Sequence, residues 1–175
     1  EPIWNREHIH RIQITMAESF GVAGRGRFYD SVGAIRDVLQ NHLLQILALL
    51  AMEPPLGTSA EAVRDEQAKL LKAIRPLEPG DLVRGQYEGY GNEEGVRHGS
   101  DTETFAAVRF FVDTWRWAGV PFIVRTGKNL PLTTTEIRAE FQLPPQRVFA
   151  LSEAGPLATN YLRMRLSPTV SIALG

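Results

Sequence analysis

The stretch RDVLQNHLLQILALLAMEPP, residues 36–55, places an acid, an amide and an imidazole inside a run of aliphatic residues. The aliphatic residues recur at helical spacing, which predicts a core helix over residues 31–52 that ends before two prolines. His42 is the candidate for chemistry, because a neutral imidazole can remove a proton near neutral pH. A second interpretation stays open, in which His42 is a satisfied histidine at the boundary of the core.

A general base usually needs a carboxylate that fixes its tautomer, and Asp37 is the nearest one in the sequence. In an α-helix, however, five residues rotate the side chain by about 140° and advance it by about 7.5 Å. We therefore expect Asp37 and His42 not to stack. If His42 is a base, its orienting acid is expected to come from elsewhere, and Asp37 to border the same cavity at another height.

Glu18 and Lys128 each follow a segment with strand character. Glu18 ends the alternating stretch RIQITMAE, and Lys128 follows the apolar stretch VPFIVRTG. The glycine before Lys128 leaves room for a ligand beside the backbone, and an ammonium group suits phosphate. The competing interpretations are a solvated or salt-bridged Glu18 and an ordinary surface turn at Lys128.

No metal site is predicted. His8 and His10 share the parity of a strand, but two ligands are too few for a site, and His98 lies in a glycine-rich loop. The chain has no cysteine, which excludes disulfides and thiolate sites. The turn GRGRFYD fits neither the Walker spacing nor the dinucleotide-binding glycine pattern.

The order of the remaining segments indicates the fold class. A second helix is predicted in TSAEAVRDEQAKLLKAIRPL, with Thr58 and Glu61 as a capping box, and strand-like segments follow from Pro79 onward. Two helices followed by a run of strands predict an α+β fold, with a large, mostly antiparallel sheet and helices packed on one face.

Composition bounds the function. The 175 residues suit one domain or part of a larger one. A formal net charge of −1 argues against a general nucleic-acid binder, and no apolar run is long enough for a membrane span. The absence of cysteine fits a cytoplasmic protein. Because the chain lacks an initiator methionine and stops in strand-like sequence, we expect it to be a piece of a longer protein.

The chain resembles a known family over essentially its whole length. The segments EPIWNREHIHRIQITMAESFGVAGRGRFYD and SDTETFAAVRFFVDTWRWAGVPFIVRTGKNLP, with RDVLQNHLLQ between them, are similar to the C-terminal domain of the glucose-6-phosphate dehydrogenase family. RDVLQNHLLQ is the most specific, since it resembles the stretch that carries the family's active-site histidine. The resemblance implies oxidation of glucose 6-phosphate at C1 to the lactone, with hydride transfer to NADP, in the pentose phosphate pathway.

The resemblance also implies roles for individual residues. His42 matches the base that removes the C1 hydroxyl proton, Asp37 and Glu18 match contacts to the sugar, and Lys128 matches a substrate-binding lysine. Many family members carry a second basic residue five positions after that lysine, where this chain has Thr133. Thr133 can only hydrogen-bond, so this part of the substrate site is expected to be weaker or differently built.

Finally, the resemblance implies the domain organisation. Residues 1–175 correspond to a partial C-terminal domain, and the family's N-terminal nucleotide-binding domain is absent. NADP would be bound mainly by that missing domain, which also carries the carboxylate that orients the histidine. The 175 residues alone are expected to be inactive, and a homo-oligomer is expected to form through the sheet. The alternatives are a non-catalytic sheet module acting in assembly and an inactive homologue.

Overall fold

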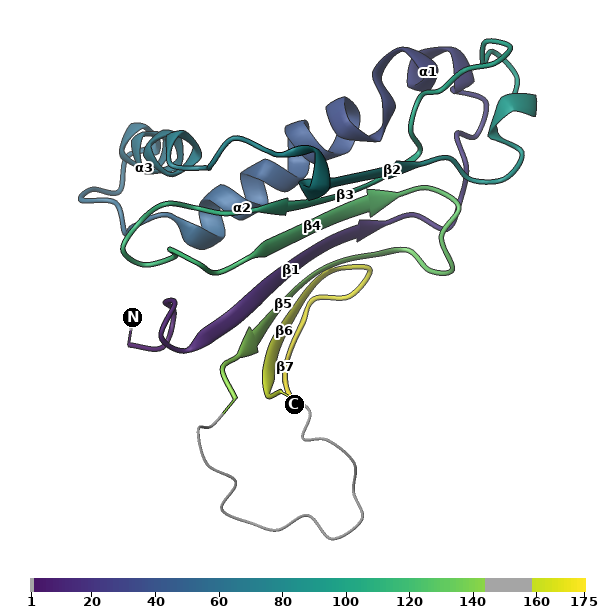
Figure 1. Ribbon diagram of the computed structural model, residues 1–175. Helices are drawn as coiled ribbons and strands as arrows, with labels where there is room; N and C mark the ends of the chain where they lie inside the picture. Colours follow the sequence, from purple (N-terminus) through teal and green to yellow (C-terminus); the bar gives the residue numbers. More distant parts are fainter. Residues whose placement is uncertain (1, 144–158) are drawn as a thin grey trace, which may run out of the picture.

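A single sheet organises the molecule. The computed structural model describes residues 2–143 and 159–175, and Figure 1 shows their arrangement. Seven strands form the sheet in the order β2-β3-β4-β1-β5-β6-β7. Their bounds are β1 Ile9–Ala17, β2 Leu82–Gly85, β3 Phe105–Phe110, β4 Phe122–Gly127, β5 Thr134–Phe141, β6 Tyr161–Ser167 and β7 Ser171–Leu174.

The pairing of the strands is mostly antiparallel. β1 and β4 run parallel, and every other neighbouring pair in the described sheet is antiparallel. The helices lie over one face of this sheet (Figure 1). They are α1 Gly26–Ala34, the π-helix η1 Ile35–Leu43, α2 Leu44–Ala51 and α3 Ala60–Lys72, with short 3₁₀ turns η2 Pro79–Asp81 and η3 Tyr90–Asn92. The predicted α+β class, sheet and helical layer are confirmed.

The core lies between the helical layer and the central strands. Alternation in β1 directs Ile12 and Ile14 to the helices, where both are completely buried. Their partners come from β4 and from successive turns of η1 and α2, and they are Phe122, Val124, Leu43, Leu47 and Ala48. This packing holds the helix that carries Asp37 and His42 against the two parallel strands.

Two predicted helix boundaries are wrong. The long helix begins at Gly26, inside the predicted glycine-rich loop, and Gly33 interrupts it with φ 69° and ψ 176°. That left-handed φ is open to glycine and closed to most residues, so the chain turns there before η1 starts. The second helix is capped by Ser59, whose Oγ accepts a hydrogen bond from Ala62 N at 3.2 Å, because Ser59 is the residue with extended backbone next to the helix. The predicted cap, Thr58, lies one residue too early.

Candidate functional site

The parallel pair β1 and β4 brings Glu18 and Lys128 together. The last register partners of the two strands are Ala17 and Gly127, so the next residue of each leaves the sheet at the same edge. Figure 1 shows both arrowheads directed toward the end where α1 lies. Lys128 Nζ donates to Glu18 Oε2 at 2.5 Å, and the lysine side chain is only 3% exposed. Lys128 is therefore a buried, paired cation and not part of a surface turn.

Two aromatic rings complete the surroundings of Lys128. Its Nζ lies 5.3 Å from the ring centroid of Phe20 and 5.1 Å from that of Tyr29, within the range of cation–π attraction. Tyr29 comes from α1 and is 3% exposed. Burial raises the pKa of its hydroxyl, and the nearby carboxylates of Asp37 and Glu18 raise it further. The Tyr29 ring therefore lies next to the Glu18–Lys128 ion pair, and the Tyr29 hydroxyl stays protonated.

Tyr29 was missed by the sequence analysis. The segment GRGRFYD was predicted to be a loop, so its tyrosine carried no helical spacing that linked it to Asp37. The residue belongs to the first helix, and its hydroxyl is buried without a hydrogen-bond partner among the described residues. Only the tertiary fold reveals its position.

The π-helix changes the relation between Asp37 and His42. Leu44 N donates to Leu39 O, a bond that spans five residues. In a π-turn of this kind, residues five apart lie one turn above each other, so Asp37 and His42 share one side of η1. The predicted α-helical offset between them is wrong, because the helix is wound differently here. Asp37 is half-buried and His42 is exposed to solvent.

Thr133 lies beside the residue that follows Glu18. Its Oγ1 accepts a hydrogen bond from Ser19 N at 2.9 Å and lies 2.8 Å from Ser19 Oγ. The loop after β4 is thereby tied to the end of β1, next to the ion pair. Glu18, Lys128 and Thr133 are thus brought to one place, and Asp37 is near enough to Tyr29 to raise the pKa of its hydroxyl.

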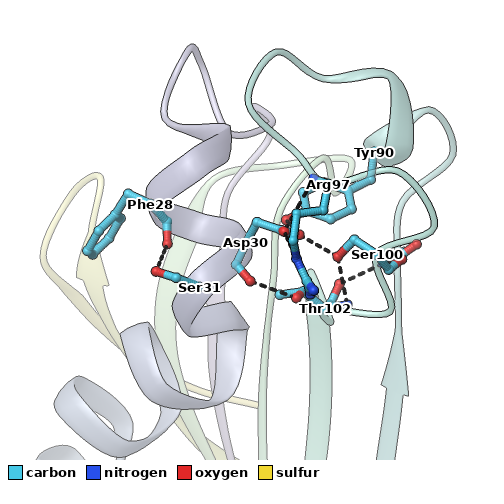
Figure 2. Close-up of polar contacts among 8 residues, drawn as sticks. Phe28, Asp30, Ser31, Tyr90, Arg97, Ser100 and Thr102 are labelled. Atoms are coloured by element: carbon cyan, nitrogen blue, oxygen red, sulfur yellow. Dashed lines mark hydrogen bonds and ion pairs between the residues drawn. The ribbon is translucent and has the colours of Figure 1, made fainter.

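A buried acid holds the loop that covers α1 (Figure 2). Asp30 accepts hydrogen bonds from the Tyr90 hydroxyl, from the backbone and side chain of Arg97, and from Ser100 Oγ. Burial alone would raise the pKa of Asp30, but the hydrogen bonds from Ser100, Arg97 and Tyr90 outweigh it and lower the pKa to about 2. Asp30 was also missed by the sequence analysis, because its partners lie about 60 residues or more along the chain.

The remaining candidates lie outside this site. His8 hydrogen-bonds Asn5 Oδ1 through Nδ1 at 3.2 Å, and His10 and His98 are exposed. Among residues 2–143 and 159–175, no three His, Asp or Glu side chains are grouped to hold a metal ion. Within the same residues, no helix has the length and apolar character that crossing a membrane requires.

Two cavities lie elsewhere on the surface. Each measures about 700 Å³; one is lined by residues around β2, from Leu77 to Glu103, and the other by residues such as Arg6, His10 and Arg109. Neither contains Glu18, Asp37, His42, Lys128 or Thr133.

Comparison with known proteins decides the family. The family model described as the glucose-6-phosphate dehydrogenase C-terminal domain matches residues 1–175. The chain belongs to this family. The resemblance found in the sequence is thereby confirmed, and the α+β fold is the fold of the glucose-6-phosphate dehydrogenase C-terminal domain.

Individual family members are similar over nearly the whole chain. Glucose-6-phosphate 1-dehydrogenase 1 of Mycobacterium tuberculosis (strain CDC 1551 / Oshkosh) is 49% identical over 172 residues, which cover 98% of this chain and 37% of the relative. The chloroplastic enzyme of Solanum tuberosum is 42% identical over 186 residues, covering 99% of this chain and 32% of the relative. The chain thus spans about a third of the length of these glucose-6-phosphate dehydrogenases.

Solved structures of the family share the fold closely. The crystal structure of glucose-6-phosphate 1-dehydrogenase from Mycobacterium avium matches with a TM-score of 0.93 and 47% identity, over 99% of this chain and 38% of that one. A glucose-6-phosphate dehydrogenase in complex with its substrate glucose 6-phosphate matches with a TM-score of 0.90 and 41% identity, over 99% and 36%.

Proposed function

We propose that this chain supplies the sugar-binding and proton-accepting part of a glucose-6-phosphate dehydrogenase active site. The enzyme would oxidise glucose 6-phosphate at C1 to the lactone and pass hydride to NADP. The family supports this proposal, as does the similarity to a dehydrogenase that was solved with glucose 6-phosphate. The observation that carries it is the preassembled Glu18–Lys128 pair, beside Tyr29 and the helix of Asp37 and His42.

The charge of the pair suggests which part of the substrate it contacts. Glu18 already balances the charge of Lys128, so the pair offers a hydrogen-bond acceptor and a donor with no net charge. That combination suits sugar hydroxyls better than a phosphate dianion. We therefore assign Glu18, Asp37 and Lys128 to the hydroxyl groups. This revises the expectation that the Lys128 ammonium holds the phosphate.

His42 has the properties required of the base. It is exposed on the side of η1 that also carries Asp37, so a substrate hydroxyl can reach its imidazole. In the proposed step, an imidazole nitrogen of His42 accepts the proton of the C1 hydroxyl as C1 is oxidised. The acid that orients His42 is expected outside this chain, in the nucleotide-binding portion of the enzyme. Thr133 supports the site through Ser19 and forms a polar contact at its rim.

The glycine-rich turn before α1 does not fit the pyrophosphate of a dinucleotide. The one glycine-rich turn that leads into a helix, before α1, is filled by neighbouring backbone: a Cβ on Gly26 would lie 2.2 Å from Glu94 O. A pyrophosphate cannot approach that helix end, although such an approach is what glycine-rich phosphate sites require. We propose that NADP is bound mainly by a separate N-terminal nucleotide-binding domain, of which residues 1–175 form no part. These residues alone are then expected to be inactive.

The outer strand β7 favours assembly through the sheet. Val170, Ile172 and Leu174 expose large apolar side chains at this end of the sheet. Exposed apolar strands at an edge favour association with another chain. We propose a homo-oligomer formed through the sheet, in addition to the enzymatic role. A cytoplasmic location stays a prediction from composition.

Calorimetric titration of the enzyme that contains this chain tests the substrate site. Lys128→Met is expected to weaken binding of glucose 6-phosphate about tenfold or more, because the half-buried Glu18 loses its partner and the site loses a hydrogen-bond donor. Inhibition by inorganic phosphate is expected to stay unchanged. Lys69→Met, at an exposed lysine of α3, is the matched control and should bind as the wild type does. Wild-type affinity in the Lys128→Met enzyme would contradict the proposal.

A further inference from the structure

One short segment touches three of the elements that carry the site. Thr102 Oγ1 donates to Asp30 O of α1 at 2.8 Å. Thr104 O accepts a hydrogen bond from Lys128 N at 3.0 Å, at the end of β4. Between them, Glu103 contacts the first turn of η1. Residues 102–104 therefore link α1, the helix of Asp37 and His42, and the buried lysine.

Glu103 binds the beginning of η1 twice. Its Oε1 accepts a hydrogen bond from Ile35 N at 2.9 Å, and its backbone carbonyl accepts one from Ala34 N at 3.0 Å. The first N–H groups of a helix have no partner within the helix, so these bonds satisfy donors that would otherwise be unpaired. Glu103 is 9% exposed, which shields both bonds from water.

The break at Gly33 belongs to the same arrangement. The left-handed φ of Gly33 redirects the chain, and a Cβ at this position would lie 2.5 Å from Glu103 Oε1. The carboxylate thus occupies the space that a side chain at residue 33 would need. α1 therefore ends next to Glu103. η1 begins beside the same carboxylate at Ile35, two residues before Asp37.

We propose that Glu103 is a positioning residue for the reaction: its carboxylate, bound to Ile35 N–H, sets the rotational position of η1 and so directs Asp37 and His42 toward the substrate held by Glu18 and Lys128. This inference rests on the proposed function. The length of the side chain matters here, more than its charge, because Oε1 must reach Ile35 N while the backbone carbonyl holds Ala34 N.

Two conservative substitutions separate the effect of the length of the Glu103 side chain from the effect of its charge. Glu103→Gln keeps an acceptor oxygen at the same distance and loses the charge, whereas Glu103→Asp keeps the charge and cannot reach Ile35 N. Neither changes the volume enough to prevent folding. Glu140→Asp is the control, since Glu140 is another buried glutamate, 3% exposed, and is paired with Arg11 near the opposite end of β1. All four enzymes are compared by kcat, by KM for glucose 6-phosphate and for NADP, and by melting temperature.

The proposal makes opposite predictions for the two variants. Glu103→Asp is expected to lower kcat about tenfold or more with KM for NADP unchanged, because a misplacement of about 1 Å already impairs catalysis. Glu103→Gln is expected to restore kcat to within about twofold of the wild type. Glu140→Asp should lower only the melting temperature. A Glu103→Asp enzyme with the kcat of Glu140→Asp, or a Glu103→Gln enzyme as impaired as Glu103→Asp, would overturn the inference. A wild-type enzyme inactive on glucose 6-phosphate would instead refute the proposed function.

Discussion

Lys128 Nζ lies 2.5 Å from Glu18 Oε2, across the parallel pair of strands β1 and β4. The backbone sets this distance, because Glu18 N also donates to Gly127 O at 3.0 Å. The ion pair is formed before any ligand is present, so neither side chain has to lose much freedom when substrate binds. We expect a site of this kind to be rigid, and substitutions of single side chains test it.

Tyr29→Phe is expected to raise the midpoint of unfolding. The Tyr29 hydroxyl is buried and has no hydrogen-bond partner among the described residues, so its removal should stabilise the fold by roughly 1 kcal/mol. Thermal denaturation of the enzyme measures the effect. Tyr90→Phe is the comparison, since the Tyr90 hydroxyl donates to Asp30 and its loss should destabilise by roughly 2 kcal/mol. A lower midpoint for Tyr29→Phe would show that the hydroxyl has a partner.

Asp30→Asn is expected to destabilise the protein in a pH-dependent way. The pKa of Asp30 is lowered from 3.8 to about 2, because hydrogen bonds from Ser100, Arg97 and Tyr90 overcome the effect of burial. The charged form is thus favoured in the folded state. Its contribution is complete above about pH 4 and is lost as the pH falls toward 2.

Denaturation of the wild type and Asp30→Asn as a function of pH checks this expectation. At pH 7 the variant should be less stable by roughly 2 kcal/mol, because its amide group faces donors from Arg97. The difference should shrink as the pH falls below 4. A difference that stays constant down to pH 2 would mean that the charge of Asp30 contributes nothing.

Gly33→Ala is expected to be more harmful than Gly24→Ala. Both glycines have a positive φ, 69° at Gly33 and 77° at Gly24, which strains alanine at either position. The ψ of 176° at Gly33 adds to its strain, because that combination of φ and ψ is essentially restricted to glycine. At Gly33 the new Cβ would also meet the Glu103 carboxylate, whereas nothing lies within 4 Å at Gly24. The difference between the melting temperatures of the two variants measures the extra cost at Gly33, from its backbone conformation and from the collision with Glu103. Equal losses would show that Glu103 moves aside freely.

The strands could be predicted from local patterns, and the pairing that builds the site could not. Alternation in RIQITMAE correctly placed Ile12 and Ile14 in the core. That β1 pairs with β4 depends on tertiary structure, since the segment between them contains every helix of the described residues and two other strands. The contact of Glu18 with Lys128 follows from this pairing and from nothing near either residue in the sequence.

The π-helical winding of the long helix could not be predicted from the sequence either. Its aliphatic residues satisfy an α-helical pattern, and they are indeed buried in large part. The break at Gly33 and the start of η1 depend on Glu103, which is 68 residues away from Ile35. The sequence analysis therefore identified His42 and Asp37 as candidates but placed them on different sides of the helix. Gly33, within SVGAI, was the one local sign of an interruption.

The His42→Asn enzyme tests the central claim most directly. Its kcat for glucose 6-phosphate and NADP and its affinity for glucose 6-phosphate are measured beside those of the wild type. His98→Asn, which changes an exposed histidine outside the proposed site, is the control and should match the wild type. If His42 is the base, kcat falls by about 10² to 10⁴ while glucose 6-phosphate binds with nearly unchanged affinity. A His42→Asn enzyme with the kcat of the wild type would contradict the account.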